Sequence, residues 1–183
     1  GKYYAADGKL VAEVRDGQGR QIEFDLKQDG RTFAPQKETQ YVNGLKEGKE
    51  TTFASWGDGR ISSETSYRKG MKNGVRKSWM PSGQLNVEET FVDDLEQGET
   101  IFWHANGMVQ SLAQYDKGKR VGTSSRYAEN GREIEETIRD GEYSRLEMQW
   151  YPEGAMMVCK KYDSATHRLI GAQRFDRHGA GRR

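Results

Sequence analysis

A glycine that returns at a fixed interval is the feature that most constrains the fold of this chain. The glycines lie 24 residues apart, with a last interval of 23, at Gly59, Gly83, Gly107, Gly131 and Gly154. Glycine is a poor helix former and readily adopts positive φ, so this spacing excludes long helices and favours regularly placed turns. A fixed period of this length indicates a repeat array, in which each repeat packs mainly against its neighbours.

Aromatic residues keep the same phase as the glycines. One set precedes the glycine of its repeat by four residues, at Trp79, Trp103, Tyr127 and Trp150. A second set follows the glycine by eight residues, at Tyr67, Phe91, Tyr115 and Tyr162, and the repeat that contains Ile134 lacks this aromatic residue. Each repeat therefore has two marked ends, with the glycine between them.

The stretch between the glycine and the second aromatic residue alternates in polarity. Leu85, Val87, Glu89 and Phe91 are predicted to share one face of a strand, with Asn86 and its alternate neighbours on the other. Each repeat is thus predicted to be a β-hairpin. We expect tight turns at glycines such as Gly107, and a looser turn where one repeat meets the next, as at residues 116–119.

The sequence therefore predicts an all-β fold, an elongated, twisted antiparallel meander of about seven or eight β-hairpin repeats. We expect one repeat domain over residues 1–183, with well-marked repeats at 41–162 and degenerate capping repeats at 1–40 and 163–183, because terminal repeats have one neighbour only. Gln36–Gln40, with Pro35, interrupts the phase and is predicted to be an irregular insertion or linker. The in-phase tryptophans and tyrosines are expected to lie in rows and to shield one another from water.

The composition narrows the classes of partner. Only 33% of the residues are hydrophobic and 31% are charged, with 29 basic and 28 acidic residues interspersed, so we expect no nucleic-acid partner. No apolar run approaches the ~18 residues of a membrane span, so we expect no membrane insertion in the visible chain. The single Cys159 can form neither an internal disulfide nor a cysteine-based zinc site. The chain starts at Gly1, which leaves the compartment open, and the periplasm or cell envelope is favoured over the cytoplasm.

One segment carries a family resemblance. Residues 98–109, Gly-Glu-Thr-Ile-Phe-Trp-His-Ala-Asn-Gly-Met-Val, followed by Tyr115 and Gly118, resemble the variant MORN repeat, as does Tyr41–Gly48. The likeness is best over residues 41–131. Bacterial chains built from this variant resemble the YwqK-type antitoxin family, and some similar repeat proteins are immunity factors for secreted toxins. The resemblance therefore implies a protein that binds and neutralises a toxin effector, including effectors that act on membranes.

The sequence contains no strong motif of a catalytic site. His104, His167 and His178 are scattered and have no metal-ligand spacing. Neighbouring acids such as Asp93 and Asp94 are expected to be solvated loop residues, and neither a Gly-x-Ser-x-Gly elbow nor a phosphate loop occurs. We therefore expect no enzyme activity, no metal and no cofactor.

The candidate partner-binding residues lie at turns that depart from the repeat. A tryptophan out of phase on an enlarged turn is the type of anchor that dominates protein interfaces, and acidic loops and a histidine beside Trp103 are further candidates. The predicted set is Trp56, Asp58, Asp93, Asp94, Glu96 and His104.

Two other functions stay open. A cell-envelope scaffold could bind glycans or lipid head groups through aromatic residues such as Trp79 and Trp103, although interior packing of these rings is favoured over a stacking platform. A hydrolase could use acidic residues such as Glu88 or Asp94.

Overall fold

The structure is a computed structural model, and it describes residues 1–4, 10–26, 33–54, 59–140, 144–163, 166, 168–178 and 181–182. These residues form seventeen β-strands and no helix, so the all-β prediction is confirmed. Their contacts divide the chain into two compact units, Gly1–Leu95 (unit 1) and Glu96–Arg183 (unit 2). The single repeat domain stays a prediction.

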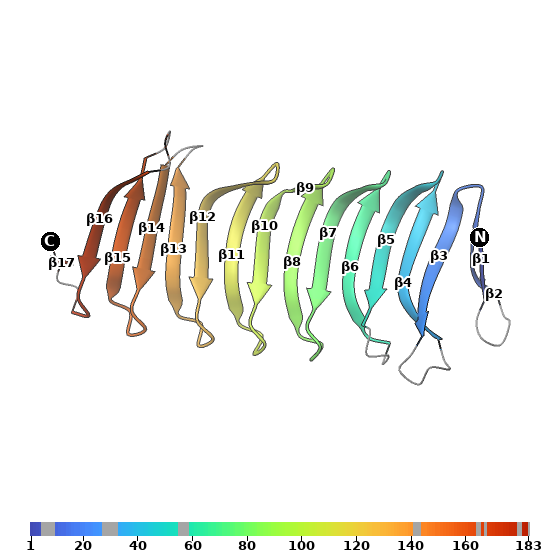
Figure 1. Cartoon of the computed structure of the whole chain (residues 1–183), viewed down its shortest axis with the longest axis horizontal. Helices are drawn as coiled ribbons and strands as arrows, with labels where there is room; N and C mark the ends of the chain where they lie inside the picture. Colours follow the sequence, from blue (N-terminus) through green and yellow to red (C-terminus); the bar gives the residue numbers. More distant parts are fainter. Residues whose placement is uncertain are drawn as a thin grey trace. The chain divides into compact units, whose positions relative to one another are not determined.

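Unit 1 is an antiparallel meander in which each strand pairs with the next along the chain (Figure 1). Its strands are β1 (Lys2–Tyr4), β2 (Leu10–Arg15), β3 (Gln18–Leu26), β4 (Phe33–Val42), β5 (Leu45–Phe53), β6 (Ile61–Arg68), β7 (Met71–Trp79) and β8 (Leu85–Val92). The short β9 (Leu95–Glu96) contains the last residue of unit 1 and the first of unit 2.

Unit 2 has the same antiparallel connection of consecutive strands. Its strands are β10 (Gly98–Trp103), β11 (Val109–Asp116), β12 (Lys119–Tyr127), β13 (Glu133–Asp140), β14 (Ser144–Trp150), β15 (Met156–Tyr162), β16 (Leu169–Phe175) and β17 (Gly181–Arg182). The predicted meander of hairpins is therefore confirmed.

The turn between β10 and β11 contains one of the predicted glycines, and the equivalent turns of other repeats contain the others. The His104 N–H donates to the Met108 carbonyl at 2.8 Å, and the Gly107 N–H donates to the His104 carbonyl at 2.9 Å. Gly107 has a φ of 84°, which glycine adopts without steric cost. The positions of these turns were thus predictable from the glycine spacing.

The turns between repeats are tighter than predicted. Lys117 and Gly118 alone connect β11 to β12, and both have positive φ, 49° and 76°. Two consecutive residues of positive φ match the right-handed twist of the flanking strands, as in a type I′ hairpin turn. The looser turn expected at residues 116–119 is therefore wrong.

Bulges change the faces of some residues. The register between β7 and β8 shifts between Ser78, which lies opposite Val87, and Trp79, which lies opposite Leu85. Asn86 is the extra residue, and its Nδ2 lies 3.4 Å from Ser78 Oγ. The prediction that Asn86 faces away from Val87 is wrong, because a bulge places two residues opposite one and interrupts the alternation.

The segment predicted as an irregular insertion or linker is part of a strand, although the ladder shifts register at both of its ends. Residues 36–40 belong to β4, which pairs with β3 on one side and β5 on the other. Pro35 lies opposite Phe24, where the register shifts after Glu23. A proline is tolerated at such a bulge because the ladder hydrogen bonds are already interrupted there.

Buried and half-buried residues form a row across each unit. Residues directly opposite one another in antiparallel strands share a face. The row of unit 1 is Thr39, Glu50, Thr65, Arg76 and Glu89, and that of unit 2 is Thr100, Ala113, Ser124, Thr137, Glu147 and Lys160. We call the face that carries this row the threonine face of each unit.

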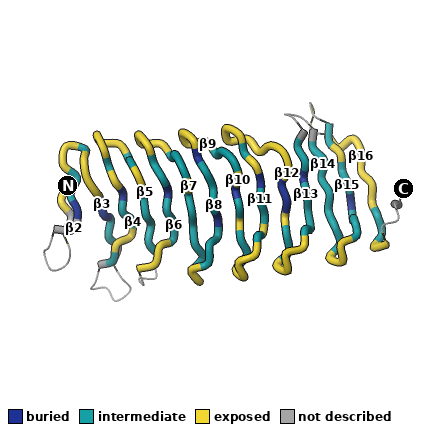
Figure 2. Tube along the Cα trace, turned by 180° about the vertical axis from the view of Figure 1, so that it is seen from behind, coloured by how far each residue is buried: buried dark blue, intermediate teal, exposed yellow. Residues whose placement is uncertain are grey.

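Small side chains occupy most of the buried positions. Thr39 and Thr100 are only 2% and 3% exposed. Figure 2 shows buried positions within the strands and exposed ones at the turns. Trp79, Trp103 and Trp150 occupy matching strand ends but are only half-buried. Mutual shielding of tryptophans is therefore not the main source of burial, since close packing at the centre of the face uses small residues.

Candidate binding surface

Aromatic residues alternate with cations along the threonine face of unit 1. The Nζ of Lys46 lies 4.6 Å from the centre of the Tyr67 ring, and the Nζ of Lys72 lies 4.8 Å from that of Phe91. Each lysine is carried by a strand next to that of its ring. The second aromatic residue of these repeats thus packs under a cation, so its ring face makes a cation–π contact rather than a contact with a second ring.

Glu50 is the centre of a polar cluster on the same face. Its carboxylate accepts hydrogen bonds from Thr39 Oγ1 at 3.0 Å and from Lys46 Nζ at 2.5 Å. Burial alone would raise the pKa of Glu50, but the hydrogen bonds from Lys46 and Thr39 outweigh it, and the pKa is lowered. Burial alone would lower the pKa of Lys46, but its hydrogen bond to Glu50 raises it. Burial and the Glu50 charge raise the pKa of Tyr67.

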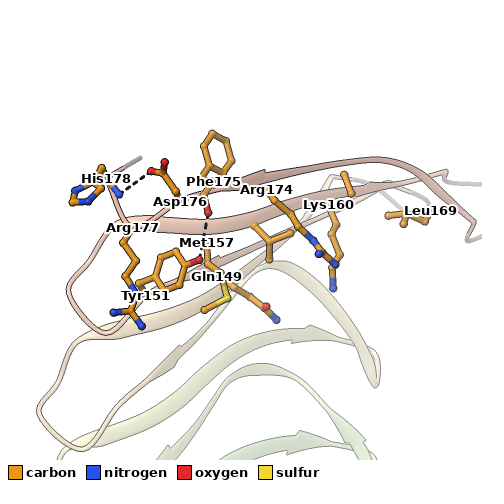
Figure 3. A pocket seen from close by; sticks show the side chains of 12 residues that line it. Gln149, Tyr151, Met157, Lys160, Leu169, Arg174, Phe175, Asp176, Arg177 and His178 are labelled. Atoms are coloured by element: carbon orange, nitrogen blue, oxygen red, sulfur yellow. Dashed lines mark hydrogen bonds between the residues drawn. The ribbon is translucent and has the colours of Figure 1, made fainter. Parts of the chain in front are cut away.

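Hollows open on the threonine face of unit 2. One of them, the C-terminal hollow, has a volume of about 850 Å³. It is formed by β14, β15, β16 and the turn that follows (Figure 3). Its lining residues are Gln149, Tyr151, Met157, Val158, Lys160, Leu169, Ala172, Arg174, Phe175, Asp176, Arg177 and His178.

The C-terminal hollow combines apolar side chains with cations. Tyr151 donates its hydroxyl hydrogen to the Phe175 carbonyl at 3.4 Å, and the guanidinium of Arg177 lies 5.8 Å from the Tyr151 ring centre (Figure 3). Arg177 also lies 3.7 Å from Glu153. Arg174 is exposed and forms no ion pair with any of the residues that the structure describes. A surface of this kind suits a partner that offers both apolar and acidic side chains.

The comparisons with known proteins identify one repeat. Residues 96–117 match the MORN repeat variant. This segment comprises β10, β11 and the residues that flank them. MORN repeats generally bind proteins or lipids. The match agrees with the resemblance at residues 98–109, whereas nothing found tests a relation to the YwqK-type antitoxin family.

No curated protein matches the chain. Among solved structures, one similar chain belongs to the crystal structure titled TcdB2-TccC3-TEV. That likeness has a TM-score of 0.28 at 11% sequence identity and covers 98% of this chain. This chain spans 11% of the length of that one.

The two aspartates that were predicted to contact a partner also stabilise the turn on which they lie. Asp94 Oδ1 accepts a hydrogen bond from the Lys72 N–H at 2.8 Å, and Asp93 Oδ1 accepts one from Asn73 Nδ2 at 2.7 Å. Both aspartates are exposed and have positive φ. They bind the turn to the preceding repeat, and their predicted role in partner contact stays a prediction. Trp56 and Asp58 lie outside the described residues.

The two remaining predicted contacts are half-buried in unit 2. His104 Nε2 lies 2.9 Å from the Tyr127 carbonyl. A carbonyl oxygen only accepts hydrogen bonds, so Nε2 carries the hydrogen. The bond links the turns of successive repeats. The Glu96 carbonyl accepts the Gly118 N–H at 2.9 Å. The described members of the predicted set are thus at turns, and they do not converge on one site.

The cationic residues of unit 2 were missed from sequence. Lys160 and Arg174 lie inside strands, where alternation alone does not reveal which face adjoins a hollow. Among the described residues, no group of three or more metal-ligating side chains is placed to hold an ion. The described part of the chain contains no helix long and apolar enough to cross a membrane.

Proposed function

We propose that this chain is a non-catalytic protein-binding repeat protein, and that it acts as an immunity or antitoxin protein that neutralises a bacterial toxin effector. The observation that carries the binding role is the C-terminal hollow. Its volume of about 850 Å³ can admit several side chains of a partner. Tyrosine, phenylalanine and arginine, the types enriched at protein interfaces, line it as Tyr151, Phe175, Arg174 and Arg177.

The antitoxin role is supported by the resemblance of residues 41–131 to the variant MORN repeat of the YwqK-type family. The match of residues 96–117 to that repeat supports a binding role in general. A neutralising protein needs only to cover the site through which its toxin acts. An open sheet face with a hollow provides such a surface without any catalytic group.

The test combines capture with co-expression. The tagged full chain is used to capture proteins from its native source, and each captured protein is expressed in bacteria alone and with the chain. We expect one captured protein to stop growth when expressed alone and to be harmless when co-expressed. Failure to recover such a protein, or lack of protection by the chain, would overturn the proposal.

A charge-reversed variant connects protection to the hollow. Arg174→Glu reverses a charge in the hollow that has no described ion pair, so we expect loss of protection with the fold retained. Lys117→Glu makes the same charge change at a two-residue turn outside the hollow, and it should protect as well as the wild type. Anionic liposomes that bind the chain, and cease to bind Trp103→Ala, would favour the lipid-binding alternative.

A further inference from the structure

Three arginines lie on adjacent strands of the threonine face of unit 2. Arg139 of β13 is directly opposite Arg145 of β14, and on its other side it is opposite Gly122 of β12. Arg120 of β12 is directly opposite Tyr115 of β11. Since directly opposite residues project to the same side, three guanidinium groups gather on one face.

Arg139 stands where the repeat has an aromatic residue. In unit 2 the residue that follows the glycine by eight positions is Tyr115 in one repeat and Tyr162 in another, and in the repeat between them it is Arg139. The two tyrosines lie beside Arg120 and Arg145, which approach their rings to 5.6 and 4.0 Å. The substitution of arginine for an aromatic ring thus removes a favourable cation–π position and adds a like charge.

The charge of Arg139 is poorly compensated in the free protein. Its side chain is half-buried, and its described bond is a long one, from Nη1 to Ser124 Oγ at 3.5 Å. It forms no ion pair with any carboxylate of the described residues. Burial, then the charges of Arg120 and Arg145, lower the pKa of Arg139. An arrangement that costs stability in the free protein is expected at a functional site.

The flanking arginines are held in place by other groups. Arg120 donates from Nη2 to the Tyr115 hydroxyl at 3.1 Å. Arg145 pairs with Glu147 at 3.0 Å. Glu147 also accepts a hydrogen bond from Tyr162 at 3.0 Å and lies 3.8 Å from Lys160 Nζ, so this carboxylate is already engaged by three partners. Positioned cations lose little conformational freedom on binding an anion.

A small hollow lies on the same face: Arg120 lines it, and Arg139 reaches one of its lining residues, Ser124. Its volume is about 120 Å³, roughly four times the ~30 Å³ that a water molecule occupies in the liquid, which is enough for a carboxylate group. Tyr115 and Arg120 line it on one side. The hydroxyls of Ser124 and Thr137 also belong to the lining residues and can donate hydrogen bonds to an anion.

We infer that Arg120, Arg139 and Arg145 form an oxyanion site that takes the carboxylate of an acidic side chain on a protein partner. This inference rests on the proposed protein-binding function. A planar guanidinium binds a carboxylate through two parallel hydrogen bonds, and arginine is enriched among the residues that dominate binding energy. Phosphate shares the oxyanion chemistry, and the experiment separates it from a peptide carboxylate.

The test is calorimetric titration of the full chain with hexaglutamate and, separately, with inorganic phosphate. We expect saturable binding of hexaglutamate, tighter than that of phosphate. Arg139→Gln should weaken hexaglutamate binding by roughly tenfold or more, the effect of losing one charge-assisted hydrogen bond. Arg132→Gln is the matched control, because Arg132 is an exposed arginine at the turn before β13 and does not line the hollow. It should keep the wild-type affinity.

Three outcomes would overturn the inference: no hexaglutamate binding, equal affinity of wild type and Arg139→Gln, or tighter binding of phosphate than of hexaglutamate. Circular dichroism verifies that each variant is folded. If Arg139→Gln fails to fold, Arg139→Tyr, which restores the aromatic residue of the repeat, replaces it with the same expected loss. The probe is a defined peptide, so failure to capture a toxin leaves this result unaffected.

Discussion

Arg139 of β13 lies directly opposite Arg145 of β14, so two like charges face each other across adjacent strands. On its other side, Arg145 lies opposite Tyr162, with its guanidinium 4.0 Å from the centre of the Tyr162 ring. The threonine face of unit 2 therefore includes one repeat in which the usual aromatic partner of the arginines is missing.

Arg139→Tyr is expected to stabilise the free protein. The change removes the repulsion of Arg120 and Arg145 and places a ring beside both, and a cation–π contact at such a site contributes about 0.5–1 kcal/mol. We expect the melting temperature to rise by roughly 2–4 °C, since about 1 kcal/mol has that effect in a chain of this length. Thermal unfolding followed by circular dichroism measures the shift.

The converse change provides the control. Tyr115→Arg should lower the melting temperature, because it removes the ring beneath Arg120 and adds a further cation. A melting temperature that falls for Arg139→Tyr would mean that Arg139 is needed for folding, which contradicts a functional origin of the cluster.

The two-residue turns predict different costs for the same substitution. Gly17 and Gly44 have similar φ, 73° and 75°, and the Gly44 N–H donates to the Gly17 carbonyl at 2.8 Å. A Cβ on Gly44 would meet no atom within 4 Å, whereas one on Gly17 would clash with the Gly44 nitrogen. Gly44→Ala should therefore cost about 1–2 kcal/mol for the left-handed backbone alone. Gly17→Ala should cost clearly more.

Urea unfolding of the two variants measures this difference. Both lose the same conformational freedom in the unfolded chain, so the comparison isolates the crowding at Gly17. Equal free energies of unfolding for the two variants would show that the turns of the first two repeats do not pack as described.

The Glu50 cluster predicts a pH-dependent contribution to stability. The folded pKa of Glu50 is lowered, so its contribution is fully present above the unfolded value of about 4.3 and is lost as the pH falls through the folded pKa. Glu50→Gln should therefore reduce the free energy of unfolding at pH 7, by roughly 1–2 kcal/mol for weakened hydrogen bonds to a charge. The loss should shrink below about pH 4.

Urea unfolding at pH 7 and in acid checks this expectation. Glu99→Gln is the matched control, since Glu99 is exposed and has no ion pair among the described residues. A cost of Glu50→Gln that is the same at both pH values would contradict the proposed contribution of the Glu50 charge.

The spacing of glycines and aromatic residues was enough to predict the hairpins. Gly107 and Gly154 adopt positive φ at the turns where the period places them. The bulge at Ser78 could not be predicted, because one extra residue in a strand leaves the 24-residue period unchanged while it moves Asn86 to another face. The period therefore determines the elements but not every side-chain direction.

The candidate site was less predictable than the fold. The missing aromatic residue in the repeat with Ile134 was visible in the sequence, but it identifies an arginine cluster only once Arg120 and Arg145 are placed on the strands beside Arg139. Likewise, Arg174 becomes a candidate contact only because it lines the hollow formed by β14, β15 and β16. Sites built from residues of several strands depend on register, which a single sequence leaves open.

The threonine face of unit 2 is the surface proposed to bind the protein partner, and two charge reversals on opposite faces test this proposal most directly. Arg174 lies opposite Val158 on the threonine face, and the exposed Lys161 lies opposite Leu146 on the other face. The measurement is the dissociation constant of the captured partner for Arg174→Glu and for Lys161→Glu. We expect weakening by roughly tenfold or more for Arg174→Glu and wild-type affinity for Lys161→Glu. Equal effects of the two variants, or a larger effect of Lys161→Glu, would contradict the claim.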